Sequence, residues 1–184
     1  VPMFLKQMAP HAHNPAHGDW KVRPIPADLL DRRVEITGPI SSTKMVIQML
    51  SPNQDGEVAN TAMLDFEDSM KPSWSNVKSG FKNIIGVANG NLSFTQDDGK
   101  SYQLNPNKMA HPMVRVRGLH LIEKNVLVNN QPVAGGFLDL LVTAFHTAKI
   151  FISNKKTPKF YVPKCEHYLE ARLWNSVFGF IENK

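Results

Sequence analysis

The feature that most constrains the fold is a fourfold alternation of short, β-prone apolar runs with segments whose apolar residues recur at helical spacing. The predicted strands and helices alternate as 34–37, 41–50, 61–64, 74–88, 113–116, 137–151, 160–162 and 166–181. Strands that are apolar on both faces favour a parallel sheet covered by helices and joined by right-handed crossovers. Two α/β arrangements stay open, half of an eight-stranded barrel or an open, doubly wound four-stranded sheet. No Gly-x-Gly-x-x-Gly turn follows any of these strands, so a dinucleotide site is unsupported.

Two insertions interrupt the alternation. The segments 92–95 and 101–104 flank Asp97-Asp98-Gly99, which predicts a β-hairpin. A second small excursion is expected around residues 129–132, where Asn129-Asn130 gives a turn signal. Both are expected to be decorations that leave the order of the parallel strands unchanged.

The first residues are predicted to be an irregular lead-in, residues 1–18, followed by one domain over residues 19–184. The lead-in holds His11, His13 and His17 at a spacing that a metal site could use. Prolines interrupt the same stretch and leave no fixed geometry, so the sequence favours a lead-in without a metal.

The amino-acid composition narrows the classes of function that this chain can have. The 184 residues are 42% hydrophobic and 20% charged, as in ordinary globular domains. The 21 basic against 16 acidic residues give a formal charge of +5 without a basic stripe, which favours a small anionic ligand over a nucleic acid. The single cysteine, Cys165, excludes an internal disulfide. No stretch is expected to reach the roughly 18 apolar residues of a membrane span.

Charged side chains follow two of the predicted strands. Asp65, Glu67 and Asp68 come directly after the second strand, with Ser69 next to them. Carboxyl ends of parallel strands meet at one edge, where barrel enzymes hold their active sites. The alternatives are a solvated loop or a helix N-terminus, where negative charge and a Ser N-cap are both favourable.

The third strand ends in Arg115-Val116-Arg117-Gly118, with His120 close behind. Alternation along a strand would place Arg115 and Arg117 on the same side, so spacing alone does not separate them. An arginine at a strand end is suited to holding substrate oxygens, and a surface salt bridge is the ordinary alternative. For His120 we expect a structural, hydrogen-bonded role rather than substrate orientation.

These segments resemble malate synthase, specifically the shorter A-type form. The resemblance rests on Asp65-Phe66-Glu67-Asp68-Ser69, on the run from Met113 to His120, and on segments 19–39 and 160–175, and it covers roughly residues 19–178. It implies a (β/α)₈ TIM barrel, and therefore favours the barrel over the doubly wound sheet. The fold expected for this chain is the N-terminal half of such a barrel, its first four βα units, with a small hairpin excursion. The C-terminal half of the barrel is expected to lie outside it.

The resemblance implies a Claisen-type condensation of acetyl-coenzyme A with glyoxylate, an acyl transfer of the glyoxylate cycle that gives malate. Arg115 matches the family's active-site arginine, which would stabilise the enolate. Glu67 and Asp68 match acidic residues that hold magnesium-bound waters, and Ser69 matches a coenzyme A contact. Arg117 stays a candidate for supporting the site.

Further contacts are expected with the nucleotide of acetyl-coenzyme A, because arginine is a natural partner of phosphate. Arg23 is the first choice and Arg32 the second, although Arg32 and its neighbour Arg33 have carboxylates nearby with which to pair. Lys164, after the fourth strand, is left open between a substrate contact and a bond to a helix carboxylate.

The resemblance also implies what this chain does not supply. The magnesium ligands and the general base, an aspartate, come from later segments in the family, so the fragment alone is expected to be inactive and to need the remainder of its own barrel. The alternatives are an acyl-coenzyme A-binding half-barrel without turnover, or another acyl-coenzyme A condensing enzyme or lyase on the same fold. No nucleic acid or membrane partner is expected. The expected location is cytoplasmic, with the peroxisome or glyoxysome as the alternative for a eukaryotic source.

Overall fold

The structure is a computed structural model that describes residues 19 and 21–183. The chain divides after Leu30 into two compact units. The described part of the first unit contains one 3₁₀ turn, η2 (Ala27–Leu29), and the exposed Arg23. The expectations for residues 1–18, including the three histidines, lie outside the described residues.

The second unit is built on a parallel sheet whose strand order follows the chain. The strands are β1 (Glu35–Pro39), β2 (Thr61–Asp65), β5 (His111–Arg115) and β8 (Phe160–Tyr161), in the order β1-β2-β5-β8. A doubly wound sheet reverses its order at a switch point, whereas each strand here adds to the same side, as in a barrel. The prediction of successive βα units of a barrel is confirmed, and the sheet of the described residues is not closed.

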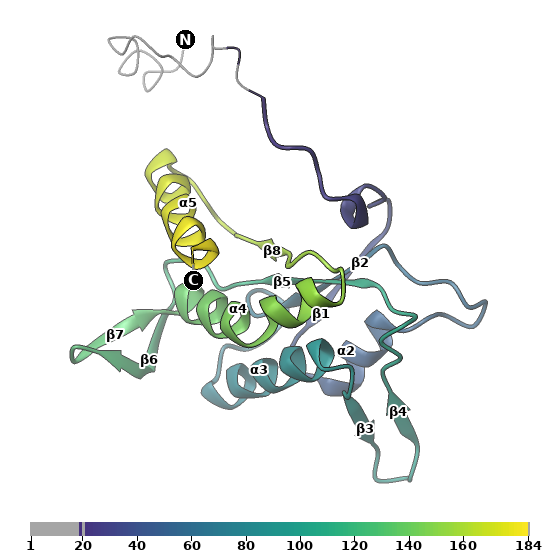
Figure 1. The fold of residues 1–184 in the computed structure, drawn as a ribbon. Helices are drawn as coiled ribbons and strands as arrows, with labels where there is room; N and C mark the ends of the chain where they lie inside the picture. The colour runs from purple at the N-terminus through teal and green to yellow at the C-terminus, as the bar shows by residue number, and fades with distance from the viewer. Residues whose placement is uncertain (1–18, 20, 184) are drawn as a thin grey trace. The chain divides into compact units, whose positions relative to one another are not determined.

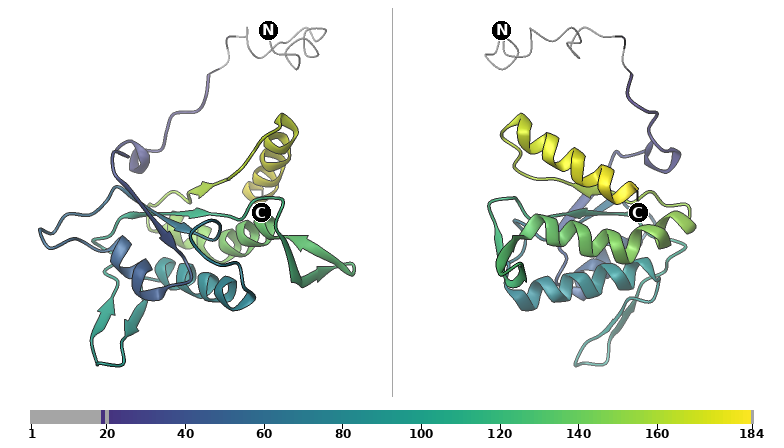
Figure 2. Two further views of the ribbon diagram at one scale, coloured as in Figure 1. Left: turned by 180° about the vertical axis from the view of Figure 1, so that it is seen from behind. Right: turned by 60° about the vertical axis from the view of Figure 1, so that its left-hand side comes forward.

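Each parallel strand is followed by one helix. The helices are α2 (Thr43–Leu50), α3 (Trp74–Ala88), α4 (Gly135–Ser153) and α5 (Tyr168–Glu182). In Figure 1, α2, α3 and α4 lie on one face of the sheet, and the right-hand view of Figure 2 shows α3, α4 and α5 side by side in chain order. A layer of helices in chain order outside the strands is the arrangement of a barrel wall.

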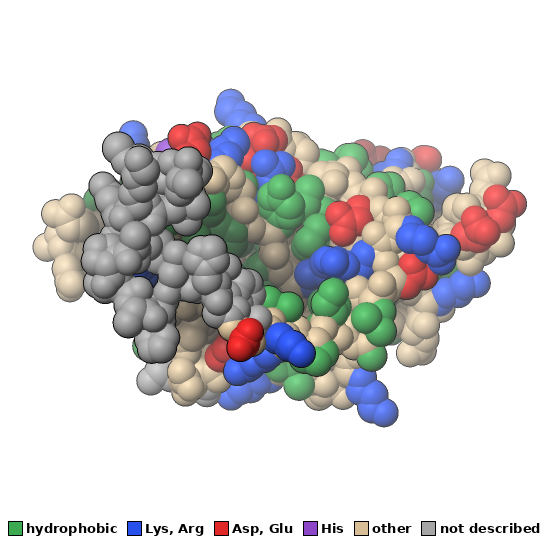
Figure 3. Space-filling model, turned by 90° about the horizontal axis from the view of Figure 1, so that it is seen from above, with side chains coloured by type: hydrophobic (Ala, Val, Ile, Leu, Met, Phe, Trp, Pro, Cys, Tyr) green, Lys and Arg blue, Asp and Glu red, His purple; other side chains and the backbone are tan. Residues whose placement is uncertain are grey.

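The main core lies between the sheet and these helices. On the helix side of the strands, Leu64 and Val114 pack with Ile84 and Leu140, and all four side chains are buried. Because side chains alternate, the in-register pair Met63 and Met113 points to the opposite face. Figure 3, seen from above, shows hydrophobic side chains between charged ones on the side away from α2, α3 and α4.

Two antiparallel hairpins decorate this framework. The first, β3 (Ser93–Thr95) with β4 (Ser101–Gln103), confirms the predicted hairpin. The second excursion is also a hairpin, β6 (Ile122–Val128) with β7 (Gln131–Ala134), whose strands the sequence analysis did not predict. Its two-residue turn uses Asn129 and Asn130 at φ 50° and 61°, the left-handed backbone that such a turn requires.

One expectation about membrane-spanning length is wrong. Helix α4 has 19 residues and a mean hydropathy of 1.3, which is long and apolar enough to cross a membrane. Its buried face carries Asp139, Thr143 and Thr147, and the helix packs beside α3. These contacts are those of a helix that covers a sheet, and the length test alone is weak support for a span.

Candidate functional site

Charged side chains from three strand ends meet at the carboxyl edge of the sheet. Arg115 is the last residue of β5, and its Nη2 lies 3.0 Å from Glu67 Oε2 and 2.7 Å from Asp68 Oδ2. Glu67 and Asp68 follow the end of β2, the neighbouring strand. The shared edge that the sequence predicted therefore brings the arginine and the two acids into direct contact.

Lys164 completes the cluster from the third strand end. It follows β8, and its Nζ lies 2.7 Å from Glu67 Oε1 and 2.9 Å from Asp68 Oδ1. Its backbone has φ 54°, a left-handed conformation that is uncommon for a lysine. These partners lie in the loop after β2 and not on a helix, and a substrate contact of Lys164 stays a prediction. Asp65, Glu67, Asp68, Arg115 and Lys164 are called the Arg115 cluster below.

Asp65 shapes the turn that presents the two acids. Its carboxylate accepts hydrogen bonds from Glu67 N at 2.7 Å, Ser69 N at 3.0 Å and Ser69 Oγ at 2.7 Å. The side chain is 1% exposed and lies 3.5 Å from Arg115 Nη1. A buried carboxylate that receives this many donors fixes the loop after β2 in one conformation.

Ser69 is exposed and belongs to this turn. The alternative interpretation of Ser69 as a helix N-cap is wrong, because Ser73 caps α3 by accepting from Asn76 N. A hydroxyl whose proton is donated to Asp65 keeps its lone pairs, so Ser69 can still accept a hydrogen bond from a ligand. The predicted coenzyme A contact is neither placed nor excluded by this geometry.

The two acids differ in burial. The Glu67 side chain is 1% exposed, whereas that of Asp68 is 58% exposed. Hydrogen bonds from Lys164 and then Arg115 lower the pKa of Asp68 to about 2. Asp68 is therefore ionised at neutral pH and held against both cations.

The pKa values of the two cations, Lys164 and Arg115, shift upward. Hydrogen bonds to Glu67 and Asp68 raise the pKa of Lys164. Burial on its own lowers the pKa of Arg115, but the surrounding carboxylates outweigh it and raise the pKa. Three carboxylates against two cations leave the Arg115 cluster with one formal negative charge in excess.

Arg115 keeps a buried donor unused among the described residues. Its Nε is buried and has no hydrogen-bond partner within that part of the chain. The guanidinium carbon also lies 5.6 Å from the ring centre of Tyr161, the residue opposite Arg115 in the β5–β8 register. A buried, unpaired N–H costs free energy unless the oxygen of a water or a ligand accepts from it, so this N–H is available to such an oxygen.

Tyr161 was not among the predicted site residues. The only sequence signal for Tyr161 is its place in the predicted strand 160–162. The register of β5 and β8 then sets it opposite Arg115, so that alternation assigns both side chains to the same side of the sheet. Without the register of β5 and β8, the sequence could not identify it.

The expected common orientation of Arg115 and Arg117 is wrong. Strand β5 ends at Arg115, so alternation does not carry on to Arg117. The Arg117 guanidinium instead donates to Asp139 at 2.9 and 2.8 Å and to Glu123 at 2.9 Å, and its side chain is 2% exposed. Arg117 therefore joins β5 to α4 and β6 and does not contact the Arg115 cluster.

Neither of the two arginines predicted to bind the nucleotide is part of the Arg115 cluster. Arg32 is exposed and precedes β1, at the amino edge of the sheet, opposite the edge that holds Arg115. Arg33 pairs with Asp31 at 2.8 Å. Arg23 is exposed in the first unit. The roles of Arg23 and Arg32 stay predictions.

Magnesium does not fit the residues described here as a complete ligand set. No group of three or more His, Cys, Asp or Glu side chains that could hold a metal occurs within residues 19 and 21–183. The carboxylates of Glu67 and Asp68 already face Arg115 and Lys164. These acids can contact waters on a neighbouring ion, but the chain described here does not itself form the cage.

Comparison with known proteins matches the sequence of this chain to malate synthases. Residues 112–184 match the family model "Malate synthase, TIM barrel domain". The chain is 47% identical over 161 residues to malate synthase of Myxococcus xanthus, and 43% identical over 166 residues to malate synthase A of Escherichia coli. It is 39% identical over 176 residues to malate synthase of Streptomyces clavuligerus.

These alignments cover most of this chain but a small part of each relative. They include 88%, 90% and 94% of this chain, respectively, and 28%, 30% and 31% of the three relatives. The chain thus spans about a third or less of the length of the curated relatives it matches.

Proposed function

Because this chain belongs to the malate synthase family, we propose that the protein containing it condenses acetyl-coenzyme A with glyoxylate and water to give malate and coenzyme A. The bond-forming carbon is the thioester methyl group, which must lose a proton before it attacks the aldehyde carbon. Hydrolysis of the thioester then releases coenzyme A. The observation that carries the proposal is the Arg115 guanidinium, held at the carboxyl edge of a half-barrel with a buried N–H unused among the described residues.

Arg115 would stabilise the charge that develops on oxygen. Removing the methyl proton places negative charge on the thioester oxygen, and a fixed cationic donor lowers the barrier most where that charge appears. The guanidinium stays protonated and offers several N–H groups in one plane, so it can hold an enolate oxygen and an oxygen of glyoxylate together.

The other members of the Arg115 cluster would fix this guanidinium. Glu67 and Asp68 bond to its Nη2, while Asp65 lies against Nη1. These bonds hold the guanidinium plane before substrate arrives, so less ordering is needed in the transition state. Lys164 holds Glu67 and Asp68 in place through its own contacts with both.

Magnesium is part of the proposal, with its ligands supplied by residues other than those described here. The negative charge in excess on the Arg115 cluster supports this, because glyoxylate is an anion and would otherwise be repelled. When bound, such an ion polarises carbonyl oxygens as a Lewis acid. Glu67 and Asp68 would hold its waters.

Acetyl-coenzyme A contacts at Ser69, Arg23 and Arg32 extend the proposal. Ser69 is supported by its exposed position beside the Arg115 cluster and by the free lone pairs of its hydroxyl. The arginines are supported only by their chemistry, since guanidinium groups bind phosphate in bidentate fashion. A cytoplasmic location is proposed as well and rests on the resemblance alone.

The experiment measures release of free thiol from acetyl-coenzyme A by the full-length protein that contains this chain. We expect release that requires both glyoxylate and magnesium, with malate formed in equal amount. The matched control for Arg115→Ala is Arg33→Ala, because Arg33 is an exposed arginine paired only with Asp31 among the described residues. Arg115→Ala should lower the rate at least ~10²-fold, and Arg33→Ala should leave it unchanged.

Three results would contradict the proposal. Thiol release that ignores glyoxylate would indicate a different acyl-coenzyme A enzyme. Release with another 2-oxo acid but not with glyoxylate would indicate a lyase or condensing enzyme of different specificity. Binding of acetyl-coenzyme A without any release would indicate a binding module.

A further inference from the structure

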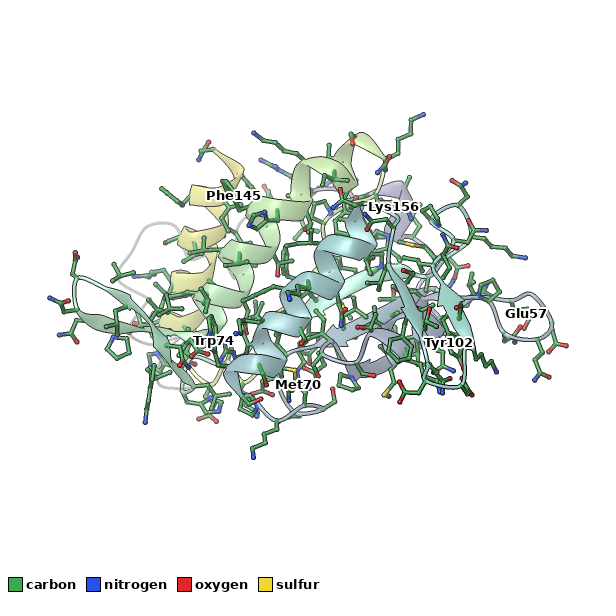
Figure 4. The ribbon with its side chains drawn as sticks, turned by 90° about the horizontal axis from the view of Figure 1, so that it is seen from below. Glu57, Met70, Trp74, Tyr102, Phe145 and Lys156 are labelled. Atoms are coloured by element: carbon green, nitrogen blue, oxygen red, sulfur yellow. The ribbon has the colours of Figure 1, made fainter. Side chains whose placement is uncertain are left out.

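A cavity lies at the edge of the sheet opposite the Arg115 cluster. Its volume is about 440 Å³, and it is formed by the last turn of α3, the loop before β5 and the end of α4. Both helices run antiparallel to the strands that they follow, so their carboxyl ends reach the amino edge of the sheet. Figure 4 shows Lys156 just beyond α4, next to the far end of α3.

Lys156 is the cation of this cavity. Its side chain is half-buried, and its Nζ donates a hydrogen bond of 3.3 Å to the carbonyl oxygen of Pro106. No ion pair of Lys156 with another described residue occurs. Burial lowers the pKa of Lys156, as expected for an ammonium group with one acceptor and no counter-ion.

The walls of the cavity combine apolar surface with amide groups. Pro106 and Met109 supply accessible apolar surface, Val87 and Phe151 line the cavity but are almost fully buried, and Asn107 and Asn154 line it as well. None of the residues that line the cavity is Asp or Glu. The site therefore offers one positive charge, hydrogen-bond donors and an apolar wall, with no negative charge to repel an anion.

This combination selects a class of ligand. A single ammonium group matches a single negative charge, and a partly buried cation gains from an anion that also accepts hydrogen bonds. The apolar wall favours a ligand with a hydrocarbon body over inorganic phosphate, which is strongly hydrated. A volume of this size lies in the range of small-molecule sites.

We propose that this cavity binds a small organic monocarboxylate, with its carboxylate on Lys156 Nζ and its hydrocarbon body against Pro106 and Met109. The site is separate from the Arg115 cluster and does not depend on the proposed condensation.

The test uses hexanoate as the probe on the full-length protein that contains this chain, with binding followed by ligand-observed NMR. Lys156→Met keeps the apolar stem and removes the charge, so it should weaken hexanoate binding at least tenfold. The matched control is Lys155→Met, because Lys155 is the exposed neighbour and does not line the cavity. Lys155→Met should bind hexanoate like the wild type.

Two ligand comparisons sharpen the result. 1-Hexanol, with the same chain and no charge, should bind more weakly than hexanoate to the wild type and equally to Lys156→Met and Lys155→Met. Inorganic phosphate should not displace hexanoate. Absence of hexanoate binding, an equal loss in both lysine variants, or displacement by phosphate would each overturn the proposal.

Arg115→Met distinguishes binding of hexanoate in the cavity from binding at the Arg115 cluster. This variant should retain hexanoate binding, and loss of binding would place the carboxylate at Arg115 and overturn the proposal. If Lys156→Met does not fold, the wild type alone gives the answer. Hexanoate should then protect Lys156, but not Lys155, from acetylation by an amine-reactive ester, as read by peptide mass spectrometry, and equal labelling with and without hexanoate would contradict the site.

Discussion

Arg115 and Arg117 are two residues apart in the sequence and lie in opposite kinds of environment. Every guanidinium nitrogen of Arg117 donates to a buried carboxylate, and its side chain is 2% exposed. Arg115 also faces carboxylates, but it is 16% exposed and its Nε has no partner among the described residues. A fully satisfied arginine joins elements of the fold, whereas one with a free donor beside a strand end is available to a ligand.

The difference begins where the strand ends. Up to Arg115, β5 is held in register with β2 and β8, and this places Arg115 beside Asp65 and Tyr161. After it, the chain turns and the backbone N–H of Arg117 donates to Asp139 of α4 at 2.9 Å. Small residues let α4 approach, since a Cβ on Gly136 would lie 2.3 Å from the carbonyl oxygen of Arg117. Close backbone packing therefore accompanies the buried arginine.

The largest effect on stability is expected from Arg117→Met. It leaves Asp139 and Glu123 buried without their cation, which costs about 3–5 kcal/mol of unfolding free energy. Arg115→Met should cost less, because Glu67 keeps Lys164 and Asp65 keeps three donors. Denaturant unfolding of the full-length protein measures both, and an equal cost for the two variants would remove the distinction.

A smaller effect on the free energy of unfolding is expected at two helical glycines, and it should have opposite signs at the two positions. Gly136→Ala should destabilise by about 1–3 kcal/mol, because the new methyl group meets the backbone oxygen of Arg117 rather than a flexible side chain. Gly179→Ala in α5 is the control, since nothing lies within 4 Å of its Cβ position. That change should stabilise by about 0.5–1 kcal/mol. Thermal unfolding measures the stability of the two variants. A Gly136→Ala protein as stable as the wild type would show that α4 is not packed tightly against Arg117.

Lys164→Met tests the Arg115 cluster through the pKa of Asp68. The folded-state pKa of Asp68, about 2, lies below its ordinary 3.8, so this ion pair adds stability above roughly pH 4 and loses it as the pH falls towards 2. Without Lys164, the first cause of the shift, the pKa of Asp68 should rise towards its ordinary value. Carboxyl ¹³C titration of Asp68 measures this, with Lys155→Met as the control. An unchanged midpoint would mean that Lys164 does not hold Asp68.

The smallest effect is expected at an exposed arginine. Arg33 and Asp31 form an ion pair whose side chains are 84% and 57% exposed. Solvent screens such pairs, so Arg33→Ala should leave the unfolding free energy unchanged within the error of the measurement. A larger loss in the same unfolding assay would show that exposed pairs of this chain matter as much as Arg117.

The sequence could predict the features that follow from local patterns. Apolar runs and helical spacing gave the four βα units, and the rule that parallel strands share a carboxyl edge brought Arg115 to Glu67 and Asp68. It could not predict the partners of Arg117, because Asp139 is 22 residues away on a helix and strand alternation was extended past the true end of β5. The hairpin strand Ile122–Val128 escaped prediction as well, since Glu123 to Asn125 interrupt its apolar pattern with polar residues.

The most direct test measures glyoxylate-dependent thiol release from acetyl-coenzyme A by the full-length protein carrying Arg115→Met, with its unfolding free energy determined on the same sample. The account predicts a rate at least ~10²-fold below the wild type in a protein that stays folded under the assay conditions. A folded Arg115→Met protein that releases thiol within about twofold of the wild-type rate, too small a loss for removal of a transition-state donor, would contradict the assignment of Arg115 as the functional arginine.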